Sequence, residues 1–321
     1  MIADSDFGDV EIERAIIEAA GFNLEAYQCK SEEDVIAHGG DAAGILTQYA
    51  HIGAAAMESL PRLRVIARYG TGVDIVDVDQ ATRHGIQVTN APSEWCADEV
   101  ADHAIALWLA AARKINEYDT ATRRGEWQWQ TGAPIFRLRG KVFGLLGYGA
   151  IAQLIAARAK AFAVQVWAYD PFVDAESMRA DKVRPVTLDE LISGCDYLTI
   201  QAPLTPDTRH LFNDTTLSRM KPTAILINTA RGPIISDAAL DRALRAGTIA
   251  AAALDDLEEE PAKRADWEPS NSLLHQPNVI VTPHAAYYSE DSIHTVRTIA
   301  AEEAVRVLTG QPAQSPVNHL S

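Results

Sequence analysis

Residues 141–170 read KVFGLLGYGAIAQLIAARAKAFAVQVWAYD. The order is an apolar strand, a glycine turn, a helical run to Phe162, a second strand and a final acid, which predicts a β-α-β unit that binds a dinucleotide. Gly147 permits the tight bend, Gly149 lets the backbone approach a pyrophosphate, and Ala152 takes the place of a third glycine. A glycine-rich structural turn is the alternative, but the flanking strands and helix favour the nucleotide site.

Two further features of this segment favour NAD as the cofactor. Ala150 and Ile151 begin the helix, whose free N–H groups and positive dipole end suit the charge of a pyrophosphate. Asp170 ends the second strand and can accept a hydrogen bond from a ribose 2′-OH, whereas a 2′-phosphate would meet its negative charge. Asp170 could instead only cap the turn before Pro171.

The composition bounds the class of protein. The chain has 321 residues, 47% of them apolar, enough for two cores of ordinary domain size. Its 44 acidic and 28 basic residues give a net charge of −16, which disfavours nucleic acid and anionic membranes as partners. Cys29, Cys96 and Cys195 lack the spacing of a metal or disulfide site. With no targeting or membrane-spanning segment in sight, we expect a soluble cytoplasmic protein without a metal.

Strands alternate with helices along the chain, which predicts an α/β fold with parallel sheets. We expect two doubly wound domains. A Rossmann NAD-binding domain over residues 96–285 is inserted into a smaller flavodoxin-like substrate or lid domain, which takes residues 1–95 and, as a C-terminal helix, residues 286–321. The two crossings, near residues 95 and 285, are expected to form a hinge and a cleft.

Several local elements are also expected. A first strand covers about Met1 to Ala3, and the Rossmann sheet has six strands. Residues 96–124 form one long amphipathic helix without Pro or Gly. A later helix is capped by Ser236 and stopped by Gly247.

Polar side chains follow three strands of the expected Rossmann sheet, in the segments NTARG at 228–232, LDDLEEEP at 254–261 and TPHAA at 282–286. Ligands bind at the carboxyl ends of parallel strands, so these segments should share one edge. Arg231 offers a planar donor fork for a carboxylate, Glu260 can accept from an imidazole, and His284 can exchange a proton near neutral pH. Taken singly, Arg231 could be a solvated loop residue, Glu260 part of a charged loop, and His284 a strand-end histidine.

The chain resembles the D-isomer-specific 2-hydroxyacid dehydrogenases over nearly its full length. The resemblance starts at RYGTGVD, residues 68–74, and rests on GYGAI at 147–151, NTARG at 228–232, ALD through EP at 253–261 and TPH at 282–284. Within that family, the segment 284–290 and the stretch between Glu260 and His284 resemble the C-terminal-binding-protein branch. That branch has a Trp where this chain has Tyr287, and in that branch the Trp shapes substrate choice.

The resemblance implies NAD-dependent interconversion of a small 2-keto acid and a D-2-hydroxy acid. His284 would protonate the carbonyl oxygen, and would act as the base in the reverse direction. Glu260 would orient His284 and favour its protonated form. Arg231 would bind the carboxylate and carbonyl of the substrate and stabilise oxyanion charge.

The same resemblance assigns the remaining contacts. The backbone N–H groups of Tyr69, Gly70 and Thr71 would cradle the substrate carboxylate, with Arg68 as a further clamp, and Tyr287 would shape substrate choice. On the cofactor side the expected contacts are Asp255 at the nicotinamide carboxamide, Ala202 and Pro203 at the adenine, and Thr71, Thr229 and Ala230.

The sequence also bears on the oligomeric state and leaves two alternative functions open. By analogy we expect a homodimer, with Trp127 and Trp129 as contact residues, and we expect His103 to be a buried, satisfied residue or an interface contact. A corepressor-like factor that senses NADH and binds a protein partner is one alternative function. A dehydrogenase of a phosphorylated hydroxy acid is another, and would need a basic pocket near residues 68–71, where only Arg68 is visible.

Overall fold

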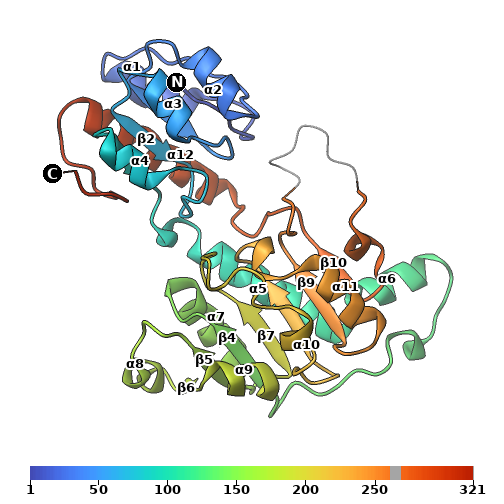
Figure 1. Ribbon diagram of the computed structural model, residues 1–321. Coiled ribbons are helices and arrows are strands. Elements are labelled where there is room, and N and C mark those ends of the chain that lie inside the picture. The colour runs from blue at the N-terminus through green and yellow to red at the C-terminus, as the bar shows by residue number, and fades with distance from the viewer. Residues whose placement is uncertain (261–268, 321) are drawn as a thin grey trace. The chain divides into compact units, whose positions relative to one another are not determined.

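The computed structural model describes residues 1–260 and 269–320, and it divides into two compact units. Of the described residues, unit 1 contains 1–95 and 289–320, and unit 2 contains 96–260 and 269–288. Each unit is built around a parallel sheet of its own (Figure 1). The predicted α/β class with two parallel sheets is therefore confirmed.

The sheet of unit 2 has seven parallel strands among the described residues, in the order β10-β9-β8-β7-β4-β5-β6. The chain enters at β4, moves outward through β5 and β6, and then returns to the other side of β4 to form β7. Ligands of open α/β sheets bind at the carboxyl ends of the strands where the order reverses, here between β4 and β7. The strands are β4 (Val142–Leu146), β5 (Gln165–Tyr169), β6 (Arg184–Pro185), β7 (Tyr197–Ile200), β8 (Ile225–Asn228), β9 (Ala251–Leu254) and β10 (Val279–Val281).

Helices cover both faces of this sheet, because side chains of a strand alternate between its faces. Phe143 and Leu145 of β4 join the core that contains α5 and α7, whereas Val142 and Leu146 join the core that contains α9 and α11. The sheet is therefore doubly wound, as predicted. The helices of unit 2 are α5 (Ala97–Arg113), α6 (Ile115–Arg123), α7 (Ala150–Lys160), α8 (Ala175–Ala180), α9 (Leu188–Gly194), α10 (Asp214–Leu217) and α11 (Asp237–Arg245), with short 3-10 turns at Trp129–Gly132, Gly232–Ile234 and Ser272–His275.

Three local expectations are corrected. The expected six strands become seven, because β6 pairs with β5 over only two residues and is too short to show a sequence pattern. The helix expected over residues 96–124 is divided at Lys114, whose φ of +57° ends α5. Glycine is the usual residue in that left-handed conformation, so a lysine there gives no signal. Ser236 precedes α11, but its side chain makes no capping hydrogen bond.

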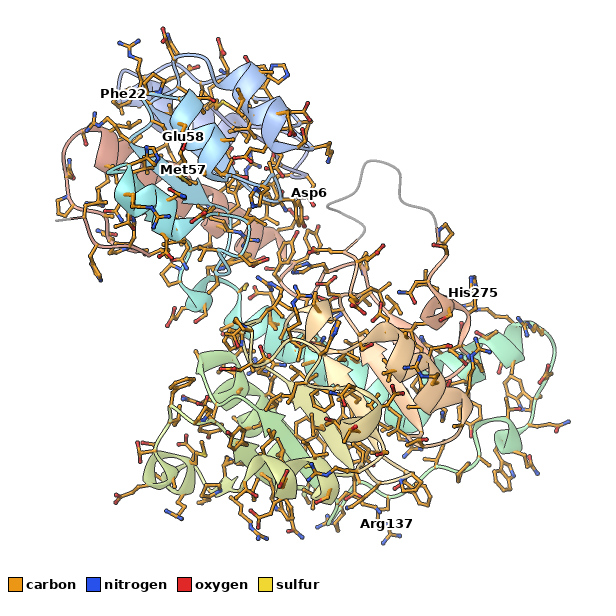
Figure 2. The ribbon with its side chains drawn as sticks, in the orientation of Figure 1. Asp6, Phe22, Met57, Glu58, Arg137 and His275 are labelled. Carbon is orange, nitrogen blue, oxygen red and sulfur yellow. The ribbon has the colours of Figure 1, made fainter. Side chains whose placement is uncertain are left out.

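Unit 1 has a three-stranded parallel sheet in the order β1-β2-β3. The strand expected at Met1 to Ala3 is reduced to isolated bridges from Ile2 to Ala26 and Leu46. On α3, Met57 is 2% exposed and belongs to the core, while Glu58 is exposed (Figure 2). The elements are α1 (Glu11–Ala19), α2 (Glu32–Gly39), β1 (Gly44–Thr47), α3 (Ala54–Ser59), β2 (Val65–Arg68), α4 (Val78–Arg83), β3 (Gln87–Thr89), a 3-10 turn at Ser93–Trp95 and α12 (Glu290–Leu308).

The C-terminal helix α12 packs against α1 and the strands of unit 1. Arg297 of α12 is 4% exposed and forms a two-pronged ion pair with Glu13 of α1, which is 1% exposed. Asp9 adds a further carboxylate at 2.7 Å from the Arg297 guanidinium. A buried ion pair of this kind holds the last helix of the chain against the first.

Candidate active site

The glycine turn joins β4 to α7 at the carboxyl end of the central strand. Gly147 has a φ of +94°, and a Cβ there would lie 2.8 Å from the Gln201 carbonyl oxygen and 3.1 Å from the Ala202 nitrogen, so glycine is required. A Cβ on Gly149 would meet nothing within 4 Å, and Gly149 offers no side chain to cap α7. An open backbone beside the first N–H groups of a helix fits a pyrophosphate. Ala202, predicted at the adenine, lies beside this turn.

Asp170 follows β5, and its carboxylate binds the glycine turn. Oδ2 accepts a hydrogen bond from the Tyr148 backbone N–H at 2.8 Å, and Oδ1 accepts one from the Phe172 N–H at 2.8 Å. A carboxylate has about four lone-pair sites, so roughly two remain for further donors. Asp170 also lines a cavity of about 670 Å³, together with Tyr169, Val186 and residues of α8 and α9. Asp170 thus fixes the turn and borders a space beside it.

Tyr148 is a residue of this turn that the sequence reasoning passed over. Its side chain is 1% exposed, and its hydroxyl donates to Asp181 Oδ2 at 2.9 Å. Burial raises the pKa of the Tyr148 phenol well above its usual range, and the hydrogen bond to Asp181 adds to the shift. Through its backbone and its side chain, Tyr148 therefore ties the turn to two acids beyond β5.

The segment after β8 is shaped by Asn228, which is fully buried. Its Nδ2 donates to the Arg231 carbonyl at 2.9 Å, and its Oδ1 accepts from the Ala230 N–H at 3.0 Å. Thr229 Oγ1 accepts from Gln201 Nε2 at 2.8 Å, which links this segment to the one after β7. The Arg231 guanidinium donates to the Ala230 carbonyl at 2.8 Å. The buried amide thus fixes the backbone that carries Arg231.

Gly232 brings the Arg231 segment against the one after β9. A Cβ on Gly232 would lie 1.8 Å from the Leu257 carbonyl oxygen, so no other residue fits this approach. Its N–H donates to Asp256 Oδ2 at 3.2 Å, and Asp256 Oδ1 accepts from the Leu257 N–H at 2.8 Å. The sequence reasoning missed Asp256, although a second acid directly after Asp255 was a signal that could have found it.

His284 and Glu260 form a direct pair. Nδ1 of His284 is hydrogen-bonded to Oε1 of Glu260, with the two side chains 19% and 5% exposed. A carboxylate oxygen of Asp256 lies within 4.8 Å of a ring nitrogen of His284 and of a carboxylate oxygen of Glu260. His284 has a φ of +52°, a conformation that a non-glycine residue keeps only when its surroundings enforce it.

Hydrogen bonds to Asp255 hold the His284 backbone in this conformation. Its carbonyl accepts from the His284 N–H at 2.6 Å, and its carboxylate accepts from the N–H groups of Ala285 at 2.9 Å and Ala286 at 2.8 Å. The Thr282 hydroxyl donates to the same carboxylate at 2.5 Å, and His103 Nε2 lies 2.9 Å from that hydroxyl oxygen. Because the single hydroxyl proton of Thr282 goes to Asp255, His103 Nε2 must be the donor to Thr282. His103, expected to be a buried, satisfied residue or an interface contact, has a side chain that is 26% exposed and belongs to the network that holds the His284 turn.

The segment expected to hold the substrate carboxylate lies in unit 1, after β2. The Tyr69 N–H donates to the Thr47 carbonyl at 2.9 Å, and the Gly70 N–H donates to the Arg68 carbonyl at 2.9 Å. Thr71 Oγ1 accepts from the Trp95 indole at 3.2 Å. A substrate carboxylate would therefore compete with protein acceptors for two of the three predicted N–H groups.

The family follows from comparison with known proteins. Residues 105–286 match the family model described as D-isomer specific 2-hydroxyacid dehydrogenase, NAD binding domain. The chain belongs to the D-isomer-specific 2-hydroxyacid dehydrogenase family. Within this family it is 42% identical to D-3-phosphoglycerate dehydrogenase of Methanocaldococcus jannaschii over 265 residues, which are 82% of this chain and 49% of that protein. It is 36% identical to glyoxylate reductase of Korarchaeum cryptofilum over 270 residues, 83% of this chain and 80% of that one.

Solved structures of other proteins have the same fold. D-lactate dehydrogenase from Aquifex aeolicus, complexed with NAD and lactic acid, is 25% identical with a TM-score of 0.89, covering 100% of this chain and 99% of that one. The TT0316 protein of Thermus thermophilus is 30% identical with a TM-score of 0.88, covering 99% of both chains. The chain spans about half the length of the phosphoglycerate dehydrogenases it matches. The predicted family and its NAD cofactor are thus confirmed.

Within this 2-hydroxyacid dehydrogenase chain, unit 2 carries most of the predicted site residues. Arg231, Glu260 and His284 follow three neighbouring strands of one sheet, and the His284 and Tyr287 rings are 6.0 Å apart, edge to face. Pro203 follows β7, and its carbonyl accepts from Thr208. The residues predicted on the substrate side, 68–71, lie in unit 1. Among the described residues, no helix has the length and apolar character needed to cross a membrane.

Proposed function

We propose that this chain is an NAD-dependent dehydrogenase that interconverts a small 2-keto acid and the corresponding D-2-hydroxy acid. The observation that carries the proposal is the His284–Glu260 pair, which follows the neighbouring strands β9 and β10 in the sheet that bears the glycine turn. An imidazole oriented by a buried carboxylate is the arrangement that a general acid-base catalyst requires.

The cofactor would be held by residues of unit 2. The glycine turn and the N-terminus of α7 would take the pyrophosphate, and Asp170 would accept from the ribose hydroxyls. The remaining proposed contacts are Ala150, Ile151, Ala202, Pro203, Thr229, Ala230 and Asp255, with Thr71 from unit 1. When bound, NAD supplies the hydride acceptor, and NADH the hydride donor, for C2 of the substrate.

His284 would move the proton at the substrate oxygen. Because Nδ1 is engaged by Glu260, Nε2 is the ring nitrogen left for proton exchange. Glu260 would keep the ring in one orientation and stabilise the imidazolium that forms when the hydroxy acid is oxidised. Asp255 would act through the backbone of residues 284–286, holding the turn in its left-handed conformation.

Arg231 would bind the substrate. Its planar guanidinium suits the paired oxygens of a carboxylate or keto acid, and its positive charge would stabilise negative charge on the carbonyl oxygen. A positive group is needed here, because a net charge of −16 disfavours the approach of an anionic substrate. Arg68 and the backbone of residues 69–71 are proposed as a second anchor, and Tyr287, edge-on to His284, as the residue that limits the C2 substituent.

The similarity to phosphoglycerate dehydrogenases favours a phosphorylated hydroxy acid as a second candidate substrate. Both candidates are separated by an NADH-oxidation assay with glyoxylate, hydroxypyruvate and phosphohydroxypyruvate. A higher kcat/KM for the two small keto acids supports the proposal, and a preference for phosphohydroxypyruvate overturns the substrate class. Absence of turnover with every keto acid, together with NADH-dependent capture of a protein partner, would instead favour the corepressor-like function.

The residue roles are tested by His284→Ala and Arg231→Ala. We expect His284→Ala to lower kcat by about 100-fold or more, the usual scale of general acid-base catalysis, while NADH binding stays intact. Arg231→Ala should raise KM for the keto acid and lower kcat together. Near-normal turnover without His284, or an Arg231 effect confined to cofactor affinity, would contradict these roles.

A homodimer is proposed from the exposed aromatic residues of unit 2. Trp127 is 87% exposed and Trp129 73%, and Phe136, at 45%, lies on the same connection between α6 and β4. Figure 2 labels Arg137 on that connection, which is also exposed. Large apolar side chains exposed on a surface favour a protein contact. The test is the mass in solution by light scattering: the dimer should dissociate in the Trp127→Ser/Trp129→Ser variant, and a monomeric unsubstituted chain would refute it.

A further inference from the structure

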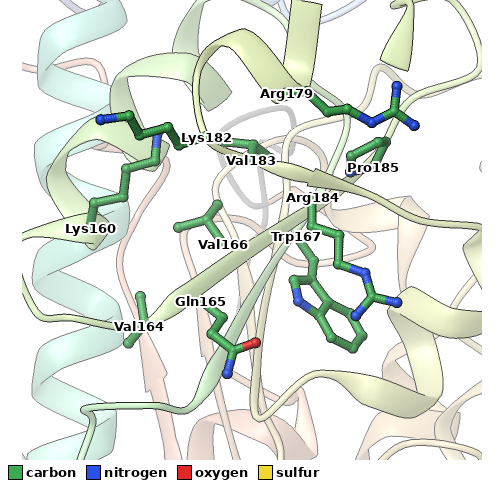
Figure 3. Close-up of a pocket in the computed structure, with 10 residues that line it drawn as sticks. All are labelled: Lys160, Val164, Gln165, Val166, Trp167, Arg179, Lys182, Val183, Arg184 and Pro185. Atoms are coloured by element: carbon green, nitrogen blue, oxygen red, sulfur yellow. The ribbon is translucent and has the colours of Figure 1, made fainter. Parts of the chain in front are cut away.

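A second cavity of unit 2, of about 460 Å³, shares Arg179 and Pro185 with the cavity that Asp170 lines, but neither Asp170 nor a residue of the glycine turn lines it. Its walls come from the C-terminal end of α7, the start of β5, and the segment from α8 to β6 (Figure 3). β5 has Gln165 in this cavity at one end and Asp170 just beyond the other, and five residues of extended strand span roughly 17 Å. The lining residues are Lys160, Val164, Gln165, Val166, Trp167, Arg179, Lys182, Val183, Arg184 and Pro185.

The charge of this cavity is opposite to that of the chain. Four of its ten lining residues are basic and none is acidic, whereas the chain has 44 acidic and 28 basic residues. The nearby acids neutralise it only in part. Asp181 binds the Tyr148 hydroxyl with its carboxylate, and Glu190 is 3.9 Å from Arg184 with both side chains more than half exposed. The basic cavity is therefore a local positive site on an acidic protein.

Two lysines meet on one side of the cavity. The Lys160 ammonium donates to the Asp181 backbone carbonyl, and Figure 3 shows the Lys160 and Lys182 side chains on the same side of the close-up. Burial lowers the pKa of Lys160, and the positive charge of Lys182 lowers it further, against the attraction of Asp181. An anion between the two ammonium groups would relieve their repulsion and the desolvation of Lys160.

Arg184 is held in place on the other side. Its guanidinium lies over the Trp167 ring at 4.5 Å from the centroid (Figure 3). Trp167 is fixed in turn, because a Cβ on Gly194 would lie 2.5 Å from its ring. The Arg184 guanidinium therefore covers one face of the indole. What the cavity offers a ligand is a pre-oriented guanidinium edge and ammonium groups, which suit the oxygens of a phosphate.

We propose that this basic cavity binds a small multivalent phosphate-type anion, such as pyrophosphate, at a site separate from the glycine turn. Its volume falls in the range of small-molecule sites, about 300–1,000 Å³. The net charge of −16 argues against a long polyanion such as nucleic acid, which would reach beyond the cavity to the acidic surface.

The test is calorimetric titration of the full chain with pyrophosphate in the presence of saturating NAD. The binding variant is Lys182→Gln/Arg184→Gln, both residues confined to this cavity. The matched control is Lys30→Gln/Arg62→Gln, which removes the same charge from exposed positions of unit 1, one of them in an exposed ion pair like that of Arg184. We expect the binding variant to raise the Kd for pyrophosphate at least about tenfold, on the scale of a lost charge-assisted hydrogen bond, and the control to leave it unchanged.

Each other outcome overturns the proposal. An equal loss in the control means that pyrophosphate responds only to the overall charge. Loss of the pyrophosphate signal when NAD is added places the anion at the glycine turn. Tighter binding of single-stranded oligonucleotide than of pyrophosphate overturns the ligand class. A binding variant whose melting temperature is unchanged and whose Kd is also unchanged shows that the cavity is no anion site. If the double variant does not fold, Lys182→Gln alone serves the same comparison.

Discussion

Removing the hydroxyl of Thr282 tests most directly whether the turn that carries His284 must be held in place. This hydroxyl donates to the Asp255 carboxylate at 2.5 Å, and that carboxylate also receives the Ala285 and Ala286 N–H groups. Thr282→Val removes the hydroxyl with little change in shape. We expect this variant to turn over keto acid more slowly than the unsubstituted enzyme while retaining its affinity for NADH.

The magnitude follows from the burial of the acceptor. Asp255 is 2% exposed, so water does not replace the lost donor. A hydrogen bond to a charged group contributes about 1.5–3 kcal/mol, which corresponds to a factor of roughly 10 to 150 in an equilibrium. The left-handed backbone of His284 itself costs about 1–3 kcal/mol. Losing one of the bonds that offset this cost should depopulate the active turn, and kcat should fall by up to that factor.

The assay is NADH oxidation under saturating keto acid, with thermal unfolding measured on the same samples. Thr282→Ser is the matched control, because it keeps the hydroxyl, and it should retain most of the turnover. The reasoning is refuted if the valine variant turns over at the unsubstituted rate, or if the serine and valine variants lose the same activity. A fall in melting temperature with unchanged kcat would show that Asp255 stabilises the fold without positioning His284.

Three further predictions concern folding and reactivity. Arg297→Leu leaves Glu13 as a buried unpaired charge and should lower the free energy of unfolding by about 3–5 kcal/mol. The double variant Glu13→Leu/Arg297→Leu should recover much of this loss. Urea unfolding measures both variants, and equal losses in the two would contradict the pairing. Gly232→Ala places a Cβ 1.8 Å from the Leu257 carbonyl oxygen, so turnover should collapse, and a fully active variant would show that this approach is not needed. Burial raises the pKa of Cys195 from 9.0 to about 12, so only the unfolded thiol ionises as the pH rises above about 9. The free energy of unfolding should therefore fall from pH 9 toward pH 12, and a Cys195→Ala variant should lack this part of the pH dependence. Alkylation of Cys195 in the native protein by iodoacetamide at pH 8 should be negligible.

The nucleotide end of the site was predictable because its chemistry is local. The glycine turn, the start of the helix and Asp170 lie within thirty consecutive residues, and each role follows from backbone freedom or charge at a fixed place in a β-α-β unit. The features that the sequence did not predict are a very short strand and a residue in the left-handed backbone conformation. The strand β6 has two residues, and Lys114 ends a helix in a conformation that its identity does not signal.

The residues proposed for catalysis were predictable from the sequence, but the hydrogen bonds that hold their segments in place were not. Strand ends and family motifs pointed to Arg231, Glu260 and His284, since polar groups gather at the carboxyl edge of a parallel sheet. The sequence contains no sign that Asn228 shapes the Arg231 turn, or that Asp256 receives the Gly232 N–H. Asn228 and Arg231 lie three residues apart in one turn, whereas Asp256 and Gly232 follow different strands, and spacing along the chain does not encode that second contact.

The sequence by itself determined the α/β class, the family, the cofactor site and the residues proposed for catalysis, because periodicity, glycine positions and side-chain chemistry are properties of the chain. Only the tertiary structure decided that Thr282, His103 and Asp255 form one network behind His284, and that basic residues from α7 to β6 line one open cavity. Both depend on which strands become neighbours, and neighbours in a sheet are chosen by packing of the whole domain.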